Sequence, residues 1–493
     1  MGERKSGSEQ NRRGKKQFPD RQKKSGAPDG DVSSTPFDGL PFMSTKVELL
    51  SPEGIYLPNR RLRRIPEKVK ERWRRVIHEF GFLLPLLVNS NYELLHGEAA
   101  YLAALDLRLR QVPVIRVDHL NQEQQAAYRI WLNKAIESEE WDEEALIAEL
   151  QEILLSEVAI DLTGFSLPEV DALLYADLGD GDRAHLDQTP DLKDHDKTPV
   201  RVGDVWLCAP HVIVCGDARD VDPLRELLGS NQIRLVLTDP PYNIPIKGVV
   251  SGAGAHVHRE FVMGSKDMSG EEFQEFLREF LRVAQSLLMD GGLIYCFMDW
   301  RSIDVLTMTA KGLGLRHMNT CVWKKTNGGM GGLYRSAHEL IGVFKYGNGA
   351  HLNNVQLGKH GRNRTNVWEY EGCNSINPDR RKELADHPTP KPVALLVDSI
   401  LDVTNRGDLV FDPFLGSGST LIAAQETDRV VLGVELDPIY VDVTLRRWLT
   451  LTGEEPVHAE TGLTYSEMVK RGRPASNQEQ IASGQNTDAE EAV

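Results

Sequence analysis

The sequence predicts an α/β protein with a largely parallel sheet covered by helices on both faces. Between about residues 199 and 455, short and continuously apolar segments alternate with amphipathic helical segments. Strands buried on both faces carry such unbroken apolar runs, as in parallel sheets. Two of these segments end in unusual loops, TDPPY at 238–242 and DPFLGSGST at 412–420. Open α/β sheets bind ligands at the carboxyl ends of their strands, so both loops indicate a functional site.

Each element of this region follows from a local pattern. The expected strands are residues 233–238, 293–298, 409–411 and 430–435. Ser269 and Glu272 have the spacing of a capping box, so a helix is expected to begin there. Its apolar residues between 273 and 288 recur on one helical face. Gly291 and Gly292 are expected to end this helix.

Composition divides the 493-residue chain into five segments. Residues 1–42 are polar and basic and are expected to be a disordered tail. Residues 43–176 carry the pattern of a small α+β domain with a helical extension. Residues 177–198 are rich in acids and are taken as a linker. Residues 199–465 form the larger domain, and residues 466–493 a second disordered tail.

The smaller domain shows strand, turn and helix signals in close succession. Residues 81–97 predict two short strands around a turn at 89–91, followed by a helix in 97–107 and a strand in 112–117. Residues 122–155 have a helical pattern, with Trp131 and Leu150 among the expected core positions.

The bulk properties exclude several classes of protein. The formal net charge is −16, although arginines cluster between residues 60 and 75. The five cysteines form no CxxC pair, so neither a zinc site nor a disulfide framework is expected. No apolar run approaches the length of a membrane span, and no apolar segment follows the basic N-terminus as in a signal peptide. We expect a cytoplasmic protein that needs no metal.

The loop at 412–420 has the features of a nucleoside site. Gly416 and Gly418 allow a tight turn and a close approach of the backbone to a ligand. Leu421 stands where a dinucleotide fingerprint places its third glycine, and no P-loop lysine is present. Glu435, at the end of the next strand, is suited to bind ribose hydroxyls. A nucleoside without a pyrophosphate is expected, and S-adenosylmethionine fits that description.

The loop at 239–242 suits a planar amine. Pro240 and Pro241 stiffen the turn and lack N–H donors, which leaves the Pro240 carbonyl as an acceptor. Asp239 adds a carboxylate acceptor, and Tyr242 a flat ring for stacking. Together they can hold an exocyclic NH₂ group with its nitrogen lone pair toward an electrophile. Positioning of this kind favours direct methyl transfer without a covalent enzyme intermediate.

These loops resemble those of the DNA amino-methyltransferases, which methylate adenine N6 or cytosine N4. The catalytic motif is matched by Asp239–Tyr242 and the cofactor motif F-x-G-x-G by residues 414–418, in the order of the β arrangement of that family. An HPTxKP element at 387–392 and an acidic element at 216–218 also match. The resemblance implies a Rossmann-like S-adenosylmethionine-dependent methyltransferase with a mixed sheet flanked by helices.

The same resemblance implies the site residues and the partners. The catalytic residues would be Asp239, Pro240, Pro241 and Tyr242. The residues at the cofactor would be Asp217, Lys391, Asp412, Phe414, Gly416, Ser417, Gly418 and Glu435. Double-stranded DNA is the expected substrate, with the target base flipped out of the helix. A bacterial, phage or mobile-element setting, linked to restriction–modification, and a homodimer are compatible with this family.

Adenine N6 is the favoured target, because D-P-P-Y favours adenine within the family. Cytosine N4 is the first alternative, and an RNA amine or a protein amide is another. An inert methyltransferase half attached to a DNA-binding protein is opposed by the intact motifs. Two segments are candidates for reading DNA, the loop 245–265 and residues 359–364, and each could equally be a solvated loop.

Residues 46–176 resemble the ParB/Srx-like domain that precedes some phage-type methyltransferases. That family places a phosphate-binding arginine after a pair matched here by His96 and Gly97. In this chain Glu98, Ala99 and Ala100 follow instead. We therefore expect no nucleotide hydrolysis by this domain. DNA contact or scaffolding is the expected role, with the arginines of 60–75 as the candidate surface.

Overall fold

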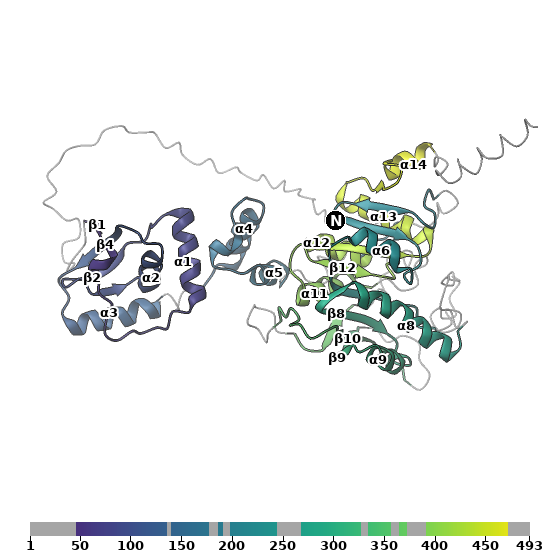
Figure 1. Ribbon diagram of the computed structural model, residues 1–493, viewed down its shortest axis with the longest axis horizontal. Helices are drawn as coiled ribbons and strands as arrows, with labels where there is room; N and C mark the ends of the chain where they lie inside the picture. Colours follow the sequence, from purple (N-terminus) through teal and green to yellow (C-terminus); the bar gives the residue numbers. More distant parts are fainter. Residues whose placement is uncertain are drawn as a thin grey trace, which may run out of the picture. The chain divides into compact units, whose positions relative to one another are not determined.

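The computed structural model describes residues 46–135, 140–176, 186–190, 198–243, 268–326, 334–355, 364–371 and 391–471. The chain divides into two compact units, residues 1–139 and 140–493 (Figure 1). The sequence suggested a boundary at 176, whereas by compactness the helices after residue 140 group with the larger unit. The physical reason is a set of buried contacts made by these helices, described below.

The smaller unit is a four-stranded sheet with helices. The sheet has the order β1 (Glu48–Leu50), β4 (Val112–Val117), β2 (Leu86–Asn89), β3 (Leu94–His96). Strand β2 runs parallel to β4, and the other two pairs are antiparallel. The helices are α1 (Glu67–Phe80), α2 (Glu98–Asp106) and α3 (Gln122–Ala135), with a short 3-10 turn at Pro52–Gly54.

The strands and helix expected in residues 81–117 are present, and so is a helix that begins at 122. Trp131 is a correction, because its side chain is 60% exposed on α3 instead of lying in the core. Leu150, in contrast, is buried as expected. Helical spacing alone could not tell which face of α3 packs.

The larger unit contains one mixed sheet of ten strands within the described residues. The order is β11 (Val367–Tyr370), β9 (Arg316–Lys325), β10 (His338–Lys345), β8 (Leu288–Met298), β7 (Ile233–Thr238), β12 (Leu409–Asp412), β13 (Val430–Glu435), β6 (His211–Cys215), β5 (Val205–Cys208), β14 (Val457–His458). The central strands from β8 to β6 are parallel. Antiparallel partners, β10 on one side and β5 on the other, extend this core.

Helices cover both faces of this sheet, as the apolar strands predicted (Figure 1). One face packs against α6 (Val221–Leu228), α8 (Gly270–Leu287) and α9 (Ile303–Gly312). The other packs against α11 (Val393–Val403), α12 (Ser419–Glu426) and α13 (Pro438–Thr452). The remaining helical elements are α4 (Glu143–Leu154), a 3-10 turn at Ile160–Thr163, α5 (Leu167–Ala176) and α14 (Tyr465–Arg471). None of the helices in the described part of the chain is long and apolar enough to cross a membrane.

Most of the expected local elements occur at the expected residues. The capping box of α8 forms, with Ser269 Oγ accepting from the Glu272 N–H and the Glu272 carboxylate accepting from the Ser269 N–H. The expected role of Gly291 and Gly292 is wrong, because the helix ends at Leu287 and both glycines lie in β8. A Cβ at Gly291 would lie 2.5 Å from the Ala350 carbonyl oxygen, so close backbone packing explains this glycine.

Two segments expected to be disordered or linking are partly ordered. Helix α14 extends through Arg471, with Met468 buried, so the C-terminal tail begins later than residue 466. Within the acidic linker, the Leu186 carbonyl accepts from Arg447 at 2.6 Å, and the Asp187 carboxylate accepts from the Val393 N–H at 2.8 Å. The polar composition of 177–198 did not reveal these anchors. The N-terminal tail lies outside the described residues.

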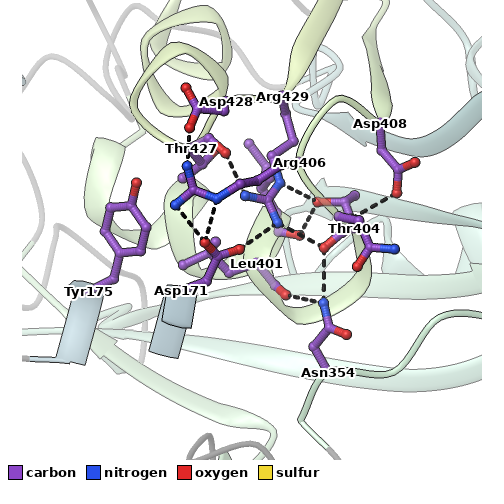
Figure 2. Close-up of polar contacts among 12 residues, drawn as sticks. Asp171, Tyr175, Asn354, Leu401, Thr404, Arg406, Asp408, Thr427, Asp428 and Arg429 are labelled. Atoms are coloured by element: carbon purple, nitrogen blue, oxygen red, sulfur yellow. Dashed lines mark hydrogen bonds and ion pairs between the residues drawn. The ribbon is translucent and has the colours of Figure 1, made fainter. Parts of the chain in front are cut away.

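A buried charge cluster holds helix α5 to the rest of the larger unit (Figure 2). Asp171 accepts hydrogen bonds from Arg406 at 2.9 Å and from Arg429 at 3.0 Å. The Arg429 side chain is fully buried and also donates to the Thr404 carbonyl at 2.9 Å. The Tyr175 hydroxyl donates to the carbonyl of Glu426. These contacts join α5 to the turns that enter β12 and β13.

Replacing Asp171 by alanine should strongly destabilise the larger unit. Removing one partner of a buried pair leaves an uncompensated charge, at a cost of about 3–5 kcal/mol. The matched control is Asp428→Ala, which removes the second carboxylate on Arg406 at a position 63% exposed. An exposed pair contributes about 1 kcal/mol or less. Urea unfolding of the full chain measures both variants, and equal losses of stability would contradict this role for Asp171.

Candidate active site

Three neighbouring parallel strands bring the two predicted loops to one edge of the sheet. Strand β7 ends at Thr238, immediately before Asp239, and pairs in parallel with β12, which ends at Asp412. Strand β12 pairs in parallel with β13, which ends at Glu435. The loops that follow these strands therefore leave the sheet on the same side, as expected for a ligand site.

Asp239 lies in a cluster of charged side chains that range from buried Lys391 to half-buried Asp239 and Lys325. Its Oδ1 accepts a hydrogen bond from the Tyr242 hydroxyl, and its Oδ2 from the Lys391 ammonium group. Lys391 also lies 3.3 Å from Oε2 of Glu339. Glu339 in turn accepts from Lys325. Two carboxylates therefore face two ammonium groups, which balances charge in a region with little water.

Burial and neighbouring charges set the protonation of this cluster. Burial raises the pKa of Asp239, against the lowering effect of Lys391. Burial also opposes ionisation of Glu339, but Lys391 and Lys325 outweigh it and lower the pKa of Glu339 to about 2. The pKa of the Tyr242 hydroxyl is raised by burial and by the two carboxylates. Tyr242 is therefore a hydrogen-bond donor at neutral pH.

The glycine loop turns as its sequence predicted, but the close approach at Gly418 is to another part of the protein and not to a ligand. Gly416 has φ +55° and Gly418 φ +84°, both in the region that favours glycine. A Cβ at Gly416 would meet nothing within 4 Å, which leaves room above the loop. A Cβ at Gly418 would lie 2.8 Å from Cγ2 of Thr444 on α13. Gly418 thus allows the loop to pack on α13.

Two further loop residues hold the loop in place. The ring of Phe414 packs against Phe276 and Phe280 of α8, with centroids 5.7 and 5.2 Å apart. The Ser417 carbonyl accepts from the buried Arg447 at 3.1 Å. The loop is therefore attached to helices on both faces of the sheet.

Asp412 and Glu435 flank this loop with carboxylates of raised pKa. Asp412 accepts from the Thr420 hydroxyl at 2.6 Å, and burial raises its pKa to about 6. Glu435 accepts from the Gly416 N–H and the Asp437 N–H, each at 2.9 Å, and burial raises its pKa to about 7. Each carboxylate oxygen can accept more than one hydrogen bond, so Glu435 retains capacity for a ligand.

Asp217 follows β6, the strand next to β13. The Gly216 N–H donates to the Glu435 carbonyl at 2.9 Å, which ties this turn to the end of β13. The Asp217 carboxylate pairs with Arg219, which lowers its pKa. Asp217 therefore lies on the same side of the sheet as the glycine loop.

The structure thus groups the predicted residues in two sets. Asp239, Tyr242 and Lys391 are in contact. The predicted cofactor residues other than Lys391 are of three kinds: loop residues (Phe414, Gly416, Ser417 and Gly418), flanking carboxylates (Asp412 and Glu435), and Asp217 after the neighbouring strand β6. Glu339 joins the first set and was missed, because no motif marks it. The available signal was an acid directly before the apolar run LIGVF in the strand HELIGVFK.

The segments proposed to read DNA lie mostly outside the described residues. The loop 245–265 and residues 359–363 are not among them. Arg364 is described, and it is paired with Asp398 and with Asp402 in the interior. Its guanidinium group is therefore used in ion pairs within the protein and is not available to contact DNA. In the described part of the chain, no group of three or more His, Cys, Asp or Glu side chains could hold a metal ion.

Comparison with known proteins gives a match over the same region. Residues 233–446 match a protein family described as DNA methylase, the N6/N4 methyltransferase family. The type II methyltransferase M.HpaI of Haemophilus parainfluenzae is 27% identical over 255 residues, 48% of this chain and 73% of that protein.

Two solved structures show weaker likeness. M1.HpyAVI in complex with SAM is 19% identical, covering 48% of this chain and 98% of that chain, with a TM-score of 0.34. The chromosome-partitioning protein ParB of Caulobacter crescentus, complexed with CTP-γ-S, is 18% identical, covering 30% of this chain and 83% of that chain, with a TM-score of 0.20. Neither TM-score bears on the fold, which the strand order establishes directly.

Gly418→Ala should be more destabilising than Gly407→Ala. Both glycines have positive φ, +84° and +79°, so both variants incur backbone strain of about 1–3 kcal/mol. Only at Gly418 does the added Cβ collide, with Thr444, since nothing lies within 4 Å of a Cβ at Gly407. Thermal unfolding of both variants measures the difference. Adding Thr444→Ala should recover the part due to the collision, and equal melting temperatures for the two glycine variants would contradict this explanation.

Proposed function

We propose that this chain, whose residues 233–446 match the DNA methylase family, methylates N6 of adenine in DNA. It is a DNA methyltransferase that uses S-adenosylmethionine and acts on an exocyclic amine. The observation that carries the proposal is the pairing of β7 with β12, which puts the Asp239–Tyr242 loop beside the Gly416–Gly418 loop. A planar amine and a methyl donor can thereby meet at one edge of the sheet.

The residues at the glycine loop fit S-adenosylmethionine. The open space at Gly416 gives the cofactor room, and the Glu435 carboxylate can accept from its ribose hydroxyls. When bound, the cofactor supplies an electrophilic methyl group on a sulfonium. Phe414, Ser417 and Gly418 support the loop, Asp412 holds it through the Phe414 N–H, and Asp217 lies near the end of β13. The loop can therefore receive the cofactor without rearranging its attachments.

The Asp239 loop would orient the target base. Asp239 and the Pro240 carbonyl accept the two amine hydrogens, Pro241 stiffens the turn, and the Tyr242 ring stacks on a flipped base. A bound S-adenosylmethionine would supply the methyl group, and these residues would hold the lone pair of the amine nitrogen toward it. The methylated nitrogen then gives up one proton to solvent. Lys391 holds Asp239 from the opposite side of the carboxylate.

Adenine is preferred over cytosine because the loop begins with Asp239, which the resemblance associates with adenine. Cytosine N4 is the second candidate, since the matched family covers both amines. An RNA amine or a protein amide would use the same acceptors. Sequencing of DNA from an expressing host with detection of modified bases tests the proposal. N6-methyladenine at one sequence motif supports it, and N4-methylcytosine alone overturns the choice of base.

The smaller unit is proposed to be a ParB/Srx-like module that contacts DNA and does not hydrolyse nucleotides. Glu98 pairs with Arg61, so the carboxylate after the His96–Gly97 pair neutralises one of the candidate arginines. Burial lowers the pKa of His96, which keeps its ring neutral. These features oppose binding of a nucleotide phosphate next to Glu98.

Asp239→Ala should abolish methyl transfer while leaving the affinity for S-adenosylmethionine nearly unchanged. The carboxylate orients the amine, and loss of such positioning lowers the rate by about a hundredfold or more. Asp222→Ala, on an exposed position of α6, is the matched control. Methyl incorporation into DNA and calorimetric titration with the cofactor measure the two effects. Wild-type turnover in the Asp239 variant would overturn the assignment.

Cofactor affinity should weaken as the pH falls below about 7, because Glu435 then becomes protonated. The pKa of this acid is raised, so its full acceptor capacity is present above pH 7 and is lost on the acid side. The expected loss is up to about tenfold per pH unit below the pKa. Glu435→Gln should bind more weakly at pH 8 and show a flatter profile. The same pH dependence in that variant would assign the titration to another group.

A further inference from the structure

Glu339 is buried among the side chains of the Asp239 loop, although it lies about 100 residues away in strand β10. Its Oε2 is 3.2 Å from the Tyr242 hydroxyl oxygen and 3.3 Å from Nζ of Lys391. Its Oε1 accepts from Nζ of Lys325. The side chain is only 12% exposed, so protein donors largely replace water around this carboxylate.

Tyr242 therefore has two carboxylates within reach of one hydrogen. Its hydroxyl bonds Oδ1 of Asp239 and lies 3.2 Å from Oε2 of Glu339. A hydroxyl group carries a single donor hydrogen, so it can make a full hydrogen bond to only one of them at a time. The Asp239 oxygen that this hydrogen occupies is one that a target amine would need.

We propose that Glu339 is a positioning residue that receives the Tyr242 hydroxyl when Asp239 accepts the target amine. This inference rests on the proposed function. The exchange leaves no buried donor unpaired, because Tyr242 passes from one carboxylate to the other. Without a second acceptor, the amine would have to displace the hydrogen bond between Tyr242 and Asp239 and leave the half-buried hydroxyl unsatisfied, which is costly.

The surrounding charges keep Glu339 ready for this exchange. Lys325 and Lys391 lower the pKa of Glu339 to about 2, so it is an anion and only accepts hydrogen bonds. Lys391 bonds both carboxylates and remains paired in either state of Tyr242. The number of charges does not change during the exchange, which limits its electrostatic cost.

Glu339→Gln tests this proposal while preserving the shape of the side chain. The single-turnover rate of DNA methylation should fall by about 10- to 100-fold, since a charged acceptor becomes neutral. The affinity for S-adenosylmethionine should stay within about twofold, because Glu339 lies with the Asp239 loop and not with the glycine loop. Glu369→Gln is the matched control, with its carboxylate 67% exposed and 2.9 Å from Lys324.

The pH profile separates positioning from a merely structural role. The groups that face Asp239 are Lys391, Tyr242, Glu339, Cys296 and Asp412. The negative charge of Glu339 raises the pKa of Asp239, so its removal lowers that pKa. The acid limb of the rate should therefore move to lower pH in Glu339→Gln, while the plateau falls. A general loss of structure would lower the plateau without this shift.

A double-mutant cycle with Tyr242→Phe identifies the route of the effect. Without the hydroxyl no exchange is needed, so Glu339→Gln should cost clearly less in the Tyr242→Phe background. Equal costs in both backgrounds, or a wild-type rate for Glu339→Gln, would overturn the proposal. If the glutamine variant does not fold, Glu339→Asp keeps the charge but withdraws the acceptor by one methylene. Glu339→Asp should lower the methylation rate, and this loss should be smaller in the Tyr242→Phe background. Equal losses in both backgrounds, or a wild-type rate for Glu339→Asp, would overturn the proposal.

Failure of this inference is distinguishable from failure of the proposed function. An inactive Asp239→Ala variant together with a fully active Glu339→Gln variant removes only the role of Glu339. An active Asp239→Ala variant instead removes the proposed function, whatever Glu339→Gln shows.

Discussion

The parallel pairing of β7 with β12, and of β12 with β13, decides where every candidate site residue lies. Asp239, Asp412 and Glu435 each follow or end one of these strands, and the pairing brings all three to one edge of the sheet. Their carboxylates then influence one another, since Asp239 raises the pKa of Asp412, and Asp412 that of Glu435. Burial by the same strands is the larger cause of both raised pKa values.

Desolvation makes the placement of cations as important as that of the acids. A buried carboxylate is stable only when it is paired or hydrogen-bonded. At the carboxyl edge, Lys391 and Lys325 pair with Asp239 and Glu339. At the opposite ends of β12 and β13, Arg406 and Arg429 pair with Asp171 of α5. Both clusters join segments that are far apart in the sequence, so the sheet and the segments around it depend on each other.

The glycine loop shows how one sequence pattern can have two physical causes. Positive φ angles at Gly416 and Gly418 agree with the turn that the pattern predicted. The open space, however, lies at Gly416, whereas the missing Cβ at Gly418 makes room for Thr444. Thr444 lies on α13, after the next strand, so its contact with the loop could not be inferred from local spacing. Trp131 shows the same limit, since its apolar spacing was correct and its burial was not.

We could predict from the sequence alone the strands β7, β12 and β13, the capping box of α8, and the two loops of the candidate site. These features depend on apolar runs, caps, prolines and glycines within a few residues of each other, so local patterns are sufficient to predict them. Packing between distant elements places Glu339, with its partner Lys325, beside the Asp239 loop, and it places Asp171 against Arg429. Glu339 and Tyr242 are 97 residues apart and Asp171 and Arg429 are 258 residues apart, so these contacts arise from strand pairing and helix packing. Buried charges require partners, but the fold alone determines which distant residues supply them.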